Sequence, residues 1–354
     1  MLLESKLRLH TLPREQCLFA FFYIGIIISV LQPGCLVAAQ SPGPSLEEYF
    51  KQMGFEAIEF ERNPRIQPFV WGVLGNGHKR KFLVDTGCGI SRLSESAAHG
   101  LKRIGQLNVI FQDSVLGTIT NQSVAVMDKL VIEGAQFINQ PVRVEQFHAD
   151  YVTVPFDGVL GYDFLARNFC VIDCWKRRLY VQSRKPSDEQ SATLEESLRL
   201  SGFTRISLDP AHLLNVQTEI NGGSVRLLID TGAPFDLLDD SELKALGLSI
   251  LHYERAATGS YIKEDVTSSV IGMGEIGRHR LHAIKAETFQ IGTSTWKNIY
   301  FGVTDLKDWE LSKPGTRGET IKGLLSLAFL GTHGALIDIS GNKLWLRPEK
   351  SGPR

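Results

Sequence analysis

The stretch Phe82-Leu-Val-Asp-Thr-Gly87 returns later in the chain as Leu227-Leu-Ile-Asp-Thr-Gly232. In both copies apolar residues run into the triplet Asp-Thr-Gly, as expected where a buried strand delivers an aspartate to its own carboxyl end. The glycine lets the backbone turn tightly and approach the carboxylate of Asp85 or Asp230, and the threonine hydroxyl can lock the loop. One such triplet would mean little, but two copies at matching places indicate a shared role.

The two stretches belong to a longer unit that the chain contains twice. Five segments of the first half recur in the same order in the second half: 46–55 as 194–203, 82–87 as 227–232, 130–139 as 289–298, 158–165 as 323–330 and 171–181 as 336–346. A repeat of about 150 residues indicates domain duplication rather than a solenoid. Small drifts in the offset predict loop insertions in the second copy.

Each copy reads as mostly β. Short alternating or wholly apolar runs are separated by turn signals such as Gly75-Asn-Gly77 and Asn221-Gly-Gly223, which is typical of antiparallel β structure. A few short helices are expected, at Ser45–Met53 and Thr193–Leu200, which open the copies, and at Ser94–Gly100 and Asp240–Leu246, which follow the Asp-Thr-Gly triplets.

Length and composition agree with two ordinary globular domains. The chain has 354 residues, of which 43% are hydrophobic and 22% charged. These values exclude a disordered chain, a collagen-like fibre and a multi-span membrane protein. The formal net charge of −1 gives no electrostatic footprint for nucleic acid.

The N-terminus is interpreted as an export segment. The apolar run from Cys17 to Leu31 fits a signal-peptide core of about 7–15 residues and falls short of the roughly 20 residues of a spanning helix. Val37 and Ala39 are the small residues that a signal peptidase needs. We expect cleavage after residue 39, with retention as a membrane anchor through 17–39 as the alternative. The mature protein would be periplasmic or secreted.

The expected domain boundaries follow from the repeats and from the polar stretch between them. They are a signal peptide or anchor over 1–39, a first domain over 40–183, a linker over 184–192, a second domain over 193–348 and a tail over 349–354.

A later apolar segment completes the pattern around the first triplet. With Val159-Leu160-Gly161 added, the sequence resembles the bacterial retropepsin-like branch of the aspartic proteases. The pattern of residues 158–165, followed by Val171-Ile-Asp173 and Leu179-Tyr180, is typical of this family. The resemblance covers about residues 45–348. It implies two tandem closed β-barrels related by a pseudo-twofold axis.

The resemblance also implies a chemistry, that of an aspartic endopeptidase. Asp85 and Asp230 would face each other at the axis and share one proton, because two carboxylates about 3 Å apart do not both ionise easily. The pair would activate a water molecule for attack on a peptide bond. Thr86 and Thr231 would hold the loops, and the two glycines, Gly87 and Gly232, would present N–H groups to the carboxylates. No metal and no cofactor is expected.

The expected partner is a peptide or protein substrate laid in extended form across the axis. A flap should cover it, and the hairpins around Gly117 and Gly259 are the candidates, although ordinary surface hairpins explain them equally well. One monomer would supply both aspartates. The alternative is a homodimer that pairs each domain with its twin.

The second copy departs from the first at two places. Ser326 stands where the first copy has Gly161, and Ala328 where it has Asp163. Both changes are expected to disturb the packing behind the Asp230 loop. They keep open an alternative function, that of an inactive pseudoprotease acting as an exported peptide-binding protein.

Two further features are given ordinary structural interpretations. Gly272-Met-Gly-Glu-Ile-Gly277 matches a dinucleotide-binding pattern but lacks the strand and helix that such a site needs, so it is predicted to be a glycine-rich β-turn. Cys170 and Cys174 flank a strand-like run and cannot bond to each other across it. Buried thiols are expected, and a bond from Cys88 to one of them stays open.

Overall fold

The structure is a computed structural model, and its described residues lie within one compact unit, Pro44–Arg354. The described ranges are 45–62, 67–107, 111–113, 117–119, 122–145, 155–210, 213–233, 235–251, 271–274, 277–280, 282–306 and 320–347. Within these ranges no helix is long and apolar enough to cross a membrane. The predicted export segment and the predicted C-terminal tail lie outside them.

The first domain is a closed barrel of six strands. In ring order these are β2 (Phe69–Leu74), β3 (Lys79–Val84), β10 (Gly158–Leu160), β4 (Arg92–Ser94), β9 (Ala135–Glu145) and β8 (Gln122–Ile132). The ring closes where Val73 and Leu74 of β2 pair with Val131 and Leu130 of β8. A further strand, β5 (Lys102–Leu107), pairs with β8 as well.

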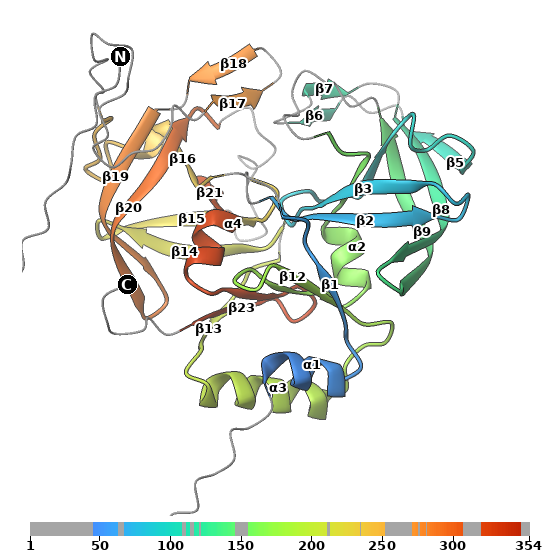
Figure 1. Ribbon diagram of the computed structural model, residues 1–354. Helices are drawn as coiled ribbons and strands as arrows, with labels where there is room; N and C mark the ends of the chain where they lie inside the picture. The colour runs from blue at the N-terminus through green and yellow to red at the C-terminus, as the bar shows by residue number, and fades with distance from the viewer. Residues whose placement is uncertain are drawn as a thin grey trace, which may run out of the picture. The chain divides into compact units, whose positions relative to one another are not determined.

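The second domain repeats this ring strand for strand (Figure 1). Its order is β14 (Asn215–Ile220), β15 (Gly223–Asp230), β21 (Gly323–Ser326), β16 (Leu237–Asp239), β20 (Ser294–Thr304) and β19 (His282–Ile291). In both rings the strand that leads to Asp-Thr-Gly runs parallel to the later apolar strand. The predicted fold class, mostly β with two closed barrels, is therefore confirmed.

A six-stranded sheet joins the two halves. Counted from its two edges, equivalent strands of the two repeats occupy equivalent positions. Its order is β1 (Glu56–Glu59), β12 (Arg178–Val181), β11 (Val171–Asp173), β22 (Leu336–Asp338), β23 (Lys343–Leu346) and β13 (Thr204–Ser207). At its centre β11 and β22 are antiparallel, and Ile172 pairs with Ile337. These two residues hold the same position in the two repeats. The pseudo-twofold axis therefore passes through this pair.

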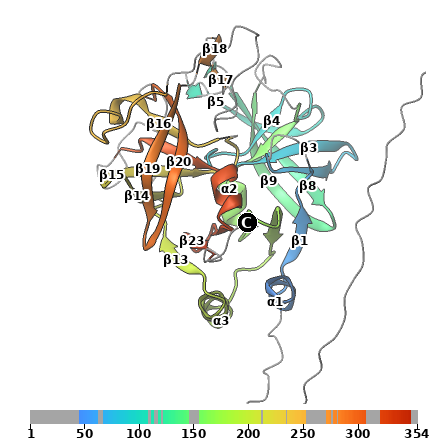
Figure 2. The ribbon, with the colours of Figure 1, turned by 60° about the vertical axis from the view of Figure 1, so that its left-hand side comes forward.

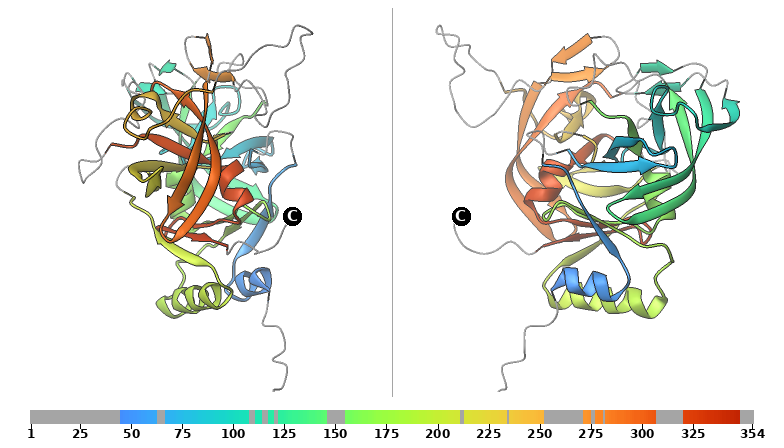
Figure 3. Two further views of the ribbon diagram at one scale, coloured as in Figure 1. Left: turned by 90° about the vertical axis from the view of Figure 1, so that its left-hand side faces the viewer. Right: turned by 45° about the vertical axis from the view of Figure 1, so that its right-hand side comes forward.

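The central strands of the joining sheet are buried on both faces, and their side chains alternate between the two faces. Ile172 and Ile337 point into the main core, while Val171 and Leu336 point into a second cluster with the helices. These helices are α1 (Leu46–Gln52) and α3 (Asp188–Leu200), which lie together beneath the sheet in two views (Figures 2 and 3). The sheet thus separates the barrels from the helices.

The structure corrects some of the expected helix positions. Helix α3 begins at Asp188, inside the polar stretch interpreted as linker, because Ser187 caps it and Gln190 completes a capping box. The predicted helix over Ser94–Gly100 is wrong: these residues form a β-strand end and turns. In its counterpart, only a 3-10 turn forms, η2 (Asp240–Glu242).

Two short helices that the sequence pattern did not indicate follow the apolar strands. They are α2 (Tyr162–Arg167) and α4 (Leu327–Thr332). Each starts directly after its strand, with Gly161 or Ser326 as the N-cap, so strand and helix form one continuous run without a loop between them. Periodicity alone cannot divide such a run.

Two hairpins stand at the end of the barrels away from α1 and α3 (Figure 1). In the first domain β6 (Phe111–Asp113) pairs with β7 (Gly117–Ile119). In the second, β17 (Ile271–Gly274) pairs with β18 (Gly277–Arg280). The predicted glycine-rich turn is therefore the end of a β-hairpin, and the dinucleotide interpretation stays excluded.

Close packing inside the first barrel gives a first test. Gly158 lies where β10 pairs with β4, and a Cβ there would stand 2.7 Å from the Arg92 carbonyl oxygen and 2.9 Å from the Phe82 ring. We expect Gly158→Ala to lower the free energy of unfolding by about 1–3 kcal/mol, as overpacking does. Gly105→Ala, at an exposed position with no atom within 4 Å of the added Cβ, is the control. Equal midpoints of the two variants in urea would contradict this account.

Candidate active site

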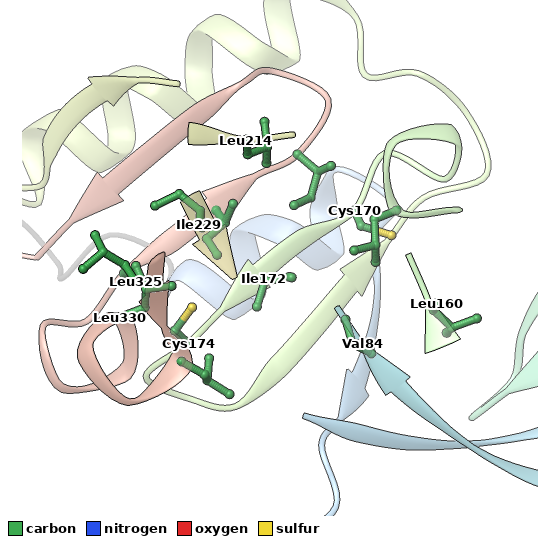
Figure 4. Packing of buried hydrophobic residues seen from close by; sticks show 14 of the residues in the cluster. Val84, Leu160, Cys170, Ile172, Cys174, Leu214, Ile229, Leu325 and Leu330 are labelled. Atoms are coloured by element: carbon green, nitrogen blue, oxygen red, sulfur yellow. The ribbon is translucent and has the colours of Figure 1, made fainter. Parts of the chain in front are cut away.

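Buried strands bring both aspartates to the axis. Val84 and Ile229, the residues before Asp85 and Asp230, are fully buried and pair with Leu160 and Leu325 of the neighbouring parallel strands. Figure 4 shows these four residues in the same core. The backbone N–H of Asp85 donates to the Leu160 carbonyl oxygen at 3.0 Å. The strand ends are thus fixed before the loops begin.

The two threonines exchange hydrogen bonds across the axis. The hydroxyl of Thr231 accepts from the Thr86 N–H (3.1 Å) and donates to the Val84 carbonyl (2.8 Å). The hydroxyl of Thr86 accepts from the Thr231 N–H (3.0 Å) and donates to the Ile229 carbonyl (2.7 Å). Both side chains are fully buried. Each loop therefore supplies the missing partners of the other.

Backbone N–H groups orient each carboxylate from its own loop. Asp85 Oδ1 accepts from Gly87 (2.8 Å) and Cys88 (3.2 Å). Asp230 Oδ1 accepts from Gly232 and from the residue after it, both at 2.9 Å. Such bonds favour the ionised carboxylate. They also fix which way each carboxyl faces.

The glycines let each carboxyl group rest against the opposite loop. A Cβ built on Gly87 would lie 2.5 Å from the Cγ of Asp230, and one built on Gly232 would lie 2.7 Å from the Oδ1 of Asp85. A real side chain never tolerates such contacts. The loops can therefore approach this closely only with glycine at both positions, and their approach is what brings the two carboxyl groups together.

The two carboxyl groups also interact electrostatically. Burial raises the pKa of Asp230 well above its usual range, and the negative charge of Asp85 and a hydrogen bond with it raise that pKa further, against the lowering effect of the backbone N–H groups. Two acids that are coupled in this way titrate as a pair. The pair retains a proton at a pH where an isolated aspartate would have lost it.

The structure brings six of the residues predicted for the site together, namely Asp85, Thr86, Gly87, Asp230, Thr231 and Gly232. Of the two flap candidates, Gly117 begins strand β7 of the first-domain hairpin, and Gly259 lies outside the described residues.

The departures of the second repeat do not disturb its packing, contrary to the expectation. Ser326 donates to Asp236 Oδ1 from its backbone N–H (2.6 Å) and its hydroxyl (2.9 Å). Its hydroxyl also caps α4 by accepting from the Ala328 N–H at 3.2 Å. Burial raises the pKa of Asp236 to about 7, although the two Ser326 bonds lower it. The second loop is therefore tied to the strand beside it.

Another contact crosses from the first domain to the second loop. The side-chain amide of Gln67 donates to the Gly232 carbonyl at 3.0 Å. Neither Gln67 nor Asp236 was predicted for the site. Asp236 could have been found from its place in the repeat, whereas nothing in the sequence around Gln67 points across the axis.

The structure also answers the questions about thiols and metal ligands. Cys88, Cys170 and Cys174 are buried thiols, and burial raises the pKa of Cys170 and Cys174. In the described part of the chain, no three side chains of His, Cys, Asp or Glu are grouped as metal ligands would be.

A family model described as "Aspartyl protease" matches residues 216–329, which run from β14 into α4. The resemblance to aspartic proteases is thereby confirmed. Among solved structures, an aspartic proteinase from Irpex lacteus matches 84% of this chain and 98% of its own at 14% identity, with a TM-score of 0.49. A comparison with curated proteins found no match.

The hydrogen bonds exchanged between the two threonines can be tested by measuring stability. Thr86→Val removes the acceptor of the buried Thr231 N–H, and a buried group left unpaired costs about 1–3 kcal/mol. We expect the free energy of unfolding to fall by that amount. Thr86→Ser keeps the hydroxyl and should stay close to the wild type. A valine variant as stable as the serine variant would speak against the exchange.

The raised pKa of Asp236 predicts a pH effect on stability. Because this pKa is about 7 in the folded protein and about 4 in an unfolded chain, the stability that the protonated acid contributes is complete below pH 4. It is lost as the pH rises through 7. The amide introduced by Asp236→Asn does not titrate. The thermal unfolding midpoint of this variant should therefore rise relative to that of the wild type as the pH increases from 4 to 8. A constant difference over that range would contradict the assignment.

Proposed function

We propose that this protein is an aspartic endopeptidase that hydrolyses peptide bonds with Asp85 and Asp230. The observation that carries the proposal is the packing of each carboxyl group against the glycine of the opposite loop, together with the electrostatic coupling of the pair. An aspartate that merely ended a strand would need neither arrangement. The family match to the second domain supports the same chemistry.

The proposed reaction uses one shared proton. The ionised carboxylate takes a proton from a water molecule while the water oxygen bonds to the carbonyl carbon of the peptide. The protonated carboxyl hydrogen-bonds the carbonyl oxygen and transfers its proton as that oxygen becomes negative. The resulting gem-diol intermediate loses its C–N bond as one carboxyl group gives its proton to the amide nitrogen and a hydroxyl of the intermediate returns a proton to the other carboxylate, so the pair again holds a single proton.

Apolar side chains beside each loop support a peptide as the substrate. In the first domain, Phe156 packs on a small cluster that includes Cys88. In the second, Leu213 and Phe235 pack on the equivalent cluster. The three side chains are only partly buried, so they can accept apolar side chains of a peptide in extended form. The hairpins β6–β7 and β17–β18 are the segments we propose as covers.

We also propose that the protein acts after export and as a monomer. The apolar segment 17–31 supports export or anchoring. Both carboxyl groups come from one chain, and their loops are hydrogen-bonded within it. A second copy is therefore not needed to complete the pair.

Replacing either aspartate tests the shared pair. We expect Asp85→Asn and Asp230→Asn each to lower kcat/KM for peptide cleavage by about 10²–10⁴-fold or more, the range for loss of a general acid or base. Asp128→Asn, at an exposed position of β8, is the control and should cleave like the wild type. The measurement is cleavage of a mixed peptide library by purified protein, read by mass spectrometry from pH 3 to pH 8.

Two outcomes would contradict the proposal. Cleavage that survives one of the two asparagine variants would exclude a pair that works as a unit. A wild-type protein that cleaves no peptide at any pH, yet binds peptides, would favour the non-catalytic peptide-binding alternative.

A further inference from the structure

The two Asp-Thr-Gly loops are each fastened by one serine and one acid. The two serine–acid pairs connect equivalent segments: Ser91 and Asp236 stand at the same position after their aspartates, and Ser326 stands where the first copy has Gly161. Asp163 and Ala328 likewise stand at the same position after their apolar strands. What differs between the domains is which segment carries the acid.

In the first domain the serine is on the loop and the acid is on the helix. Ser91 donates to Asp163 Oδ1 from its backbone N–H at 2.8 Å and from its hydroxyl at 2.7 Å. The same hydroxyl accepts from the Gly161 N–H at 3.0 Å. Asp163 lies in the first turn of α2.

In the second domain the roles are exchanged. The acid, Asp236, is on the loop, and the serine, Ser326, is at the strand-to-helix junction. As in the first domain, the backbone N–H and the hydroxyl of one serine donate to one side-chain oxygen of the acid. The hydroxyl again accepts from an N–H, here that of Ala328 in its own helix rather than one on the opposite segment. Ala328 then needs no carboxylate.

The exchanged pair acts directly on Asp230. Ser326 is the residue that pairs with Asp230 across the parallel strands β21 and β15, and Asp236 ends the loop that begins at Asp230. The bonds between Ser326 and Asp236 therefore close this loop onto the neighbouring strand. Both hydrogen bonds from Ser326 end on one oxygen of the Asp236 side chain, so they restrict where the loop N–H groups hold the Asp230 carboxyl.

We propose that Asp236 and Ser326 are positioning residues for Asp230, and that they do for this loop what Asp163 and Ser91 do for the Asp85 loop. The inference rests on the proposed function only where it concerns cleavage. It makes the second repeat an intact half of the site with exchanged residues rather than a degenerate one.

The exchange itself supplies the test. The backbone at the start of α2 (Gly161, φ −86°, ψ −177°) nearly matches that at the start of α4 (Ser326, φ −85°, ψ 170°). A carboxylate introduced at position 328 should therefore be held as Asp163 is. The triple variant Asp236→Ser, Ser326→Gly, Ala328→Asp rewrites the second domain in the pattern of the first.

The matched control is the double variant Asp236→Ser, Ser326→Gly, which differs from the triple variant only by lacking the acid. We expect the double variant to lose about tenfold or more in kcat at a nearly unchanged KM, as when an interaction that orients a reacting group is removed. The triple variant should recover most of the loss. Rates are taken per folded protein, well below each unfolding midpoint, so that loss of folded protein does not imitate loss of positioning.

The outcomes separate this inference from the proposed function. If the wild type cleaves and the triple variant is no faster than the double variant, the positioning role is wrong while the enzyme stands. If the wild type does not cleave any peptide, thermal unfolding decides: a triple variant that unfolds at a clearly higher temperature than the double variant supports the exchanged pair, and equal midpoints overturn it.

Discussion

The reciprocal hydrogen bonds between Thr86 and Thr231 are the constraint on which the rest of the structure depends. Each hydroxyl completes the backbone of the opposite loop, so neither loop is satisfied without the other. A buried N–H or carbonyl without a partner is costly, and this cost holds the two loops at one distance. The glycines then allow the carboxyl groups to lie against the opposite backbone, and burial in that place gives Asp230 its raised pKa.

Much of this could be predicted from the sequence because the chain repeats itself. A duplicated strand-loop pattern indicates a pair of equivalent loops, and a pair of loops with an aspartate each indicates an axis between them. Asp85, Asp230 and the residues that follow them were therefore predictable as a group. The export segment and the domain boundaries stay predictions.

Other features escaped prediction for physical reasons. The short helices α2 and α4 follow apolar strands without a loop between them, and α3 gains its first turns from the cap at Ser187 rather than from hydrophobic periodicity. The substitution of Gly161 by Ser326 looked like damage because the sequence was compared position by position. The hydrogen bonds from Ser326 to Asp236 compensate for this substitution. They join segments far apart in the chain, and only the fold brings these segments together.

The joining sheet has a consequence for how the molecule is made. Its first strand, β1, and its fifth, β23, come from nearly opposite ends of the described chain, and its centre is the pair formed by Ile172 with Ile337. Contacts of such long sequence separation form late in folding. In a growing chain, the centre of the joining sheet therefore cannot form before β22 has been synthesised. The sheet that joins the two repeats is thus completed only after both Asp-Thr-Gly loops have been synthesised.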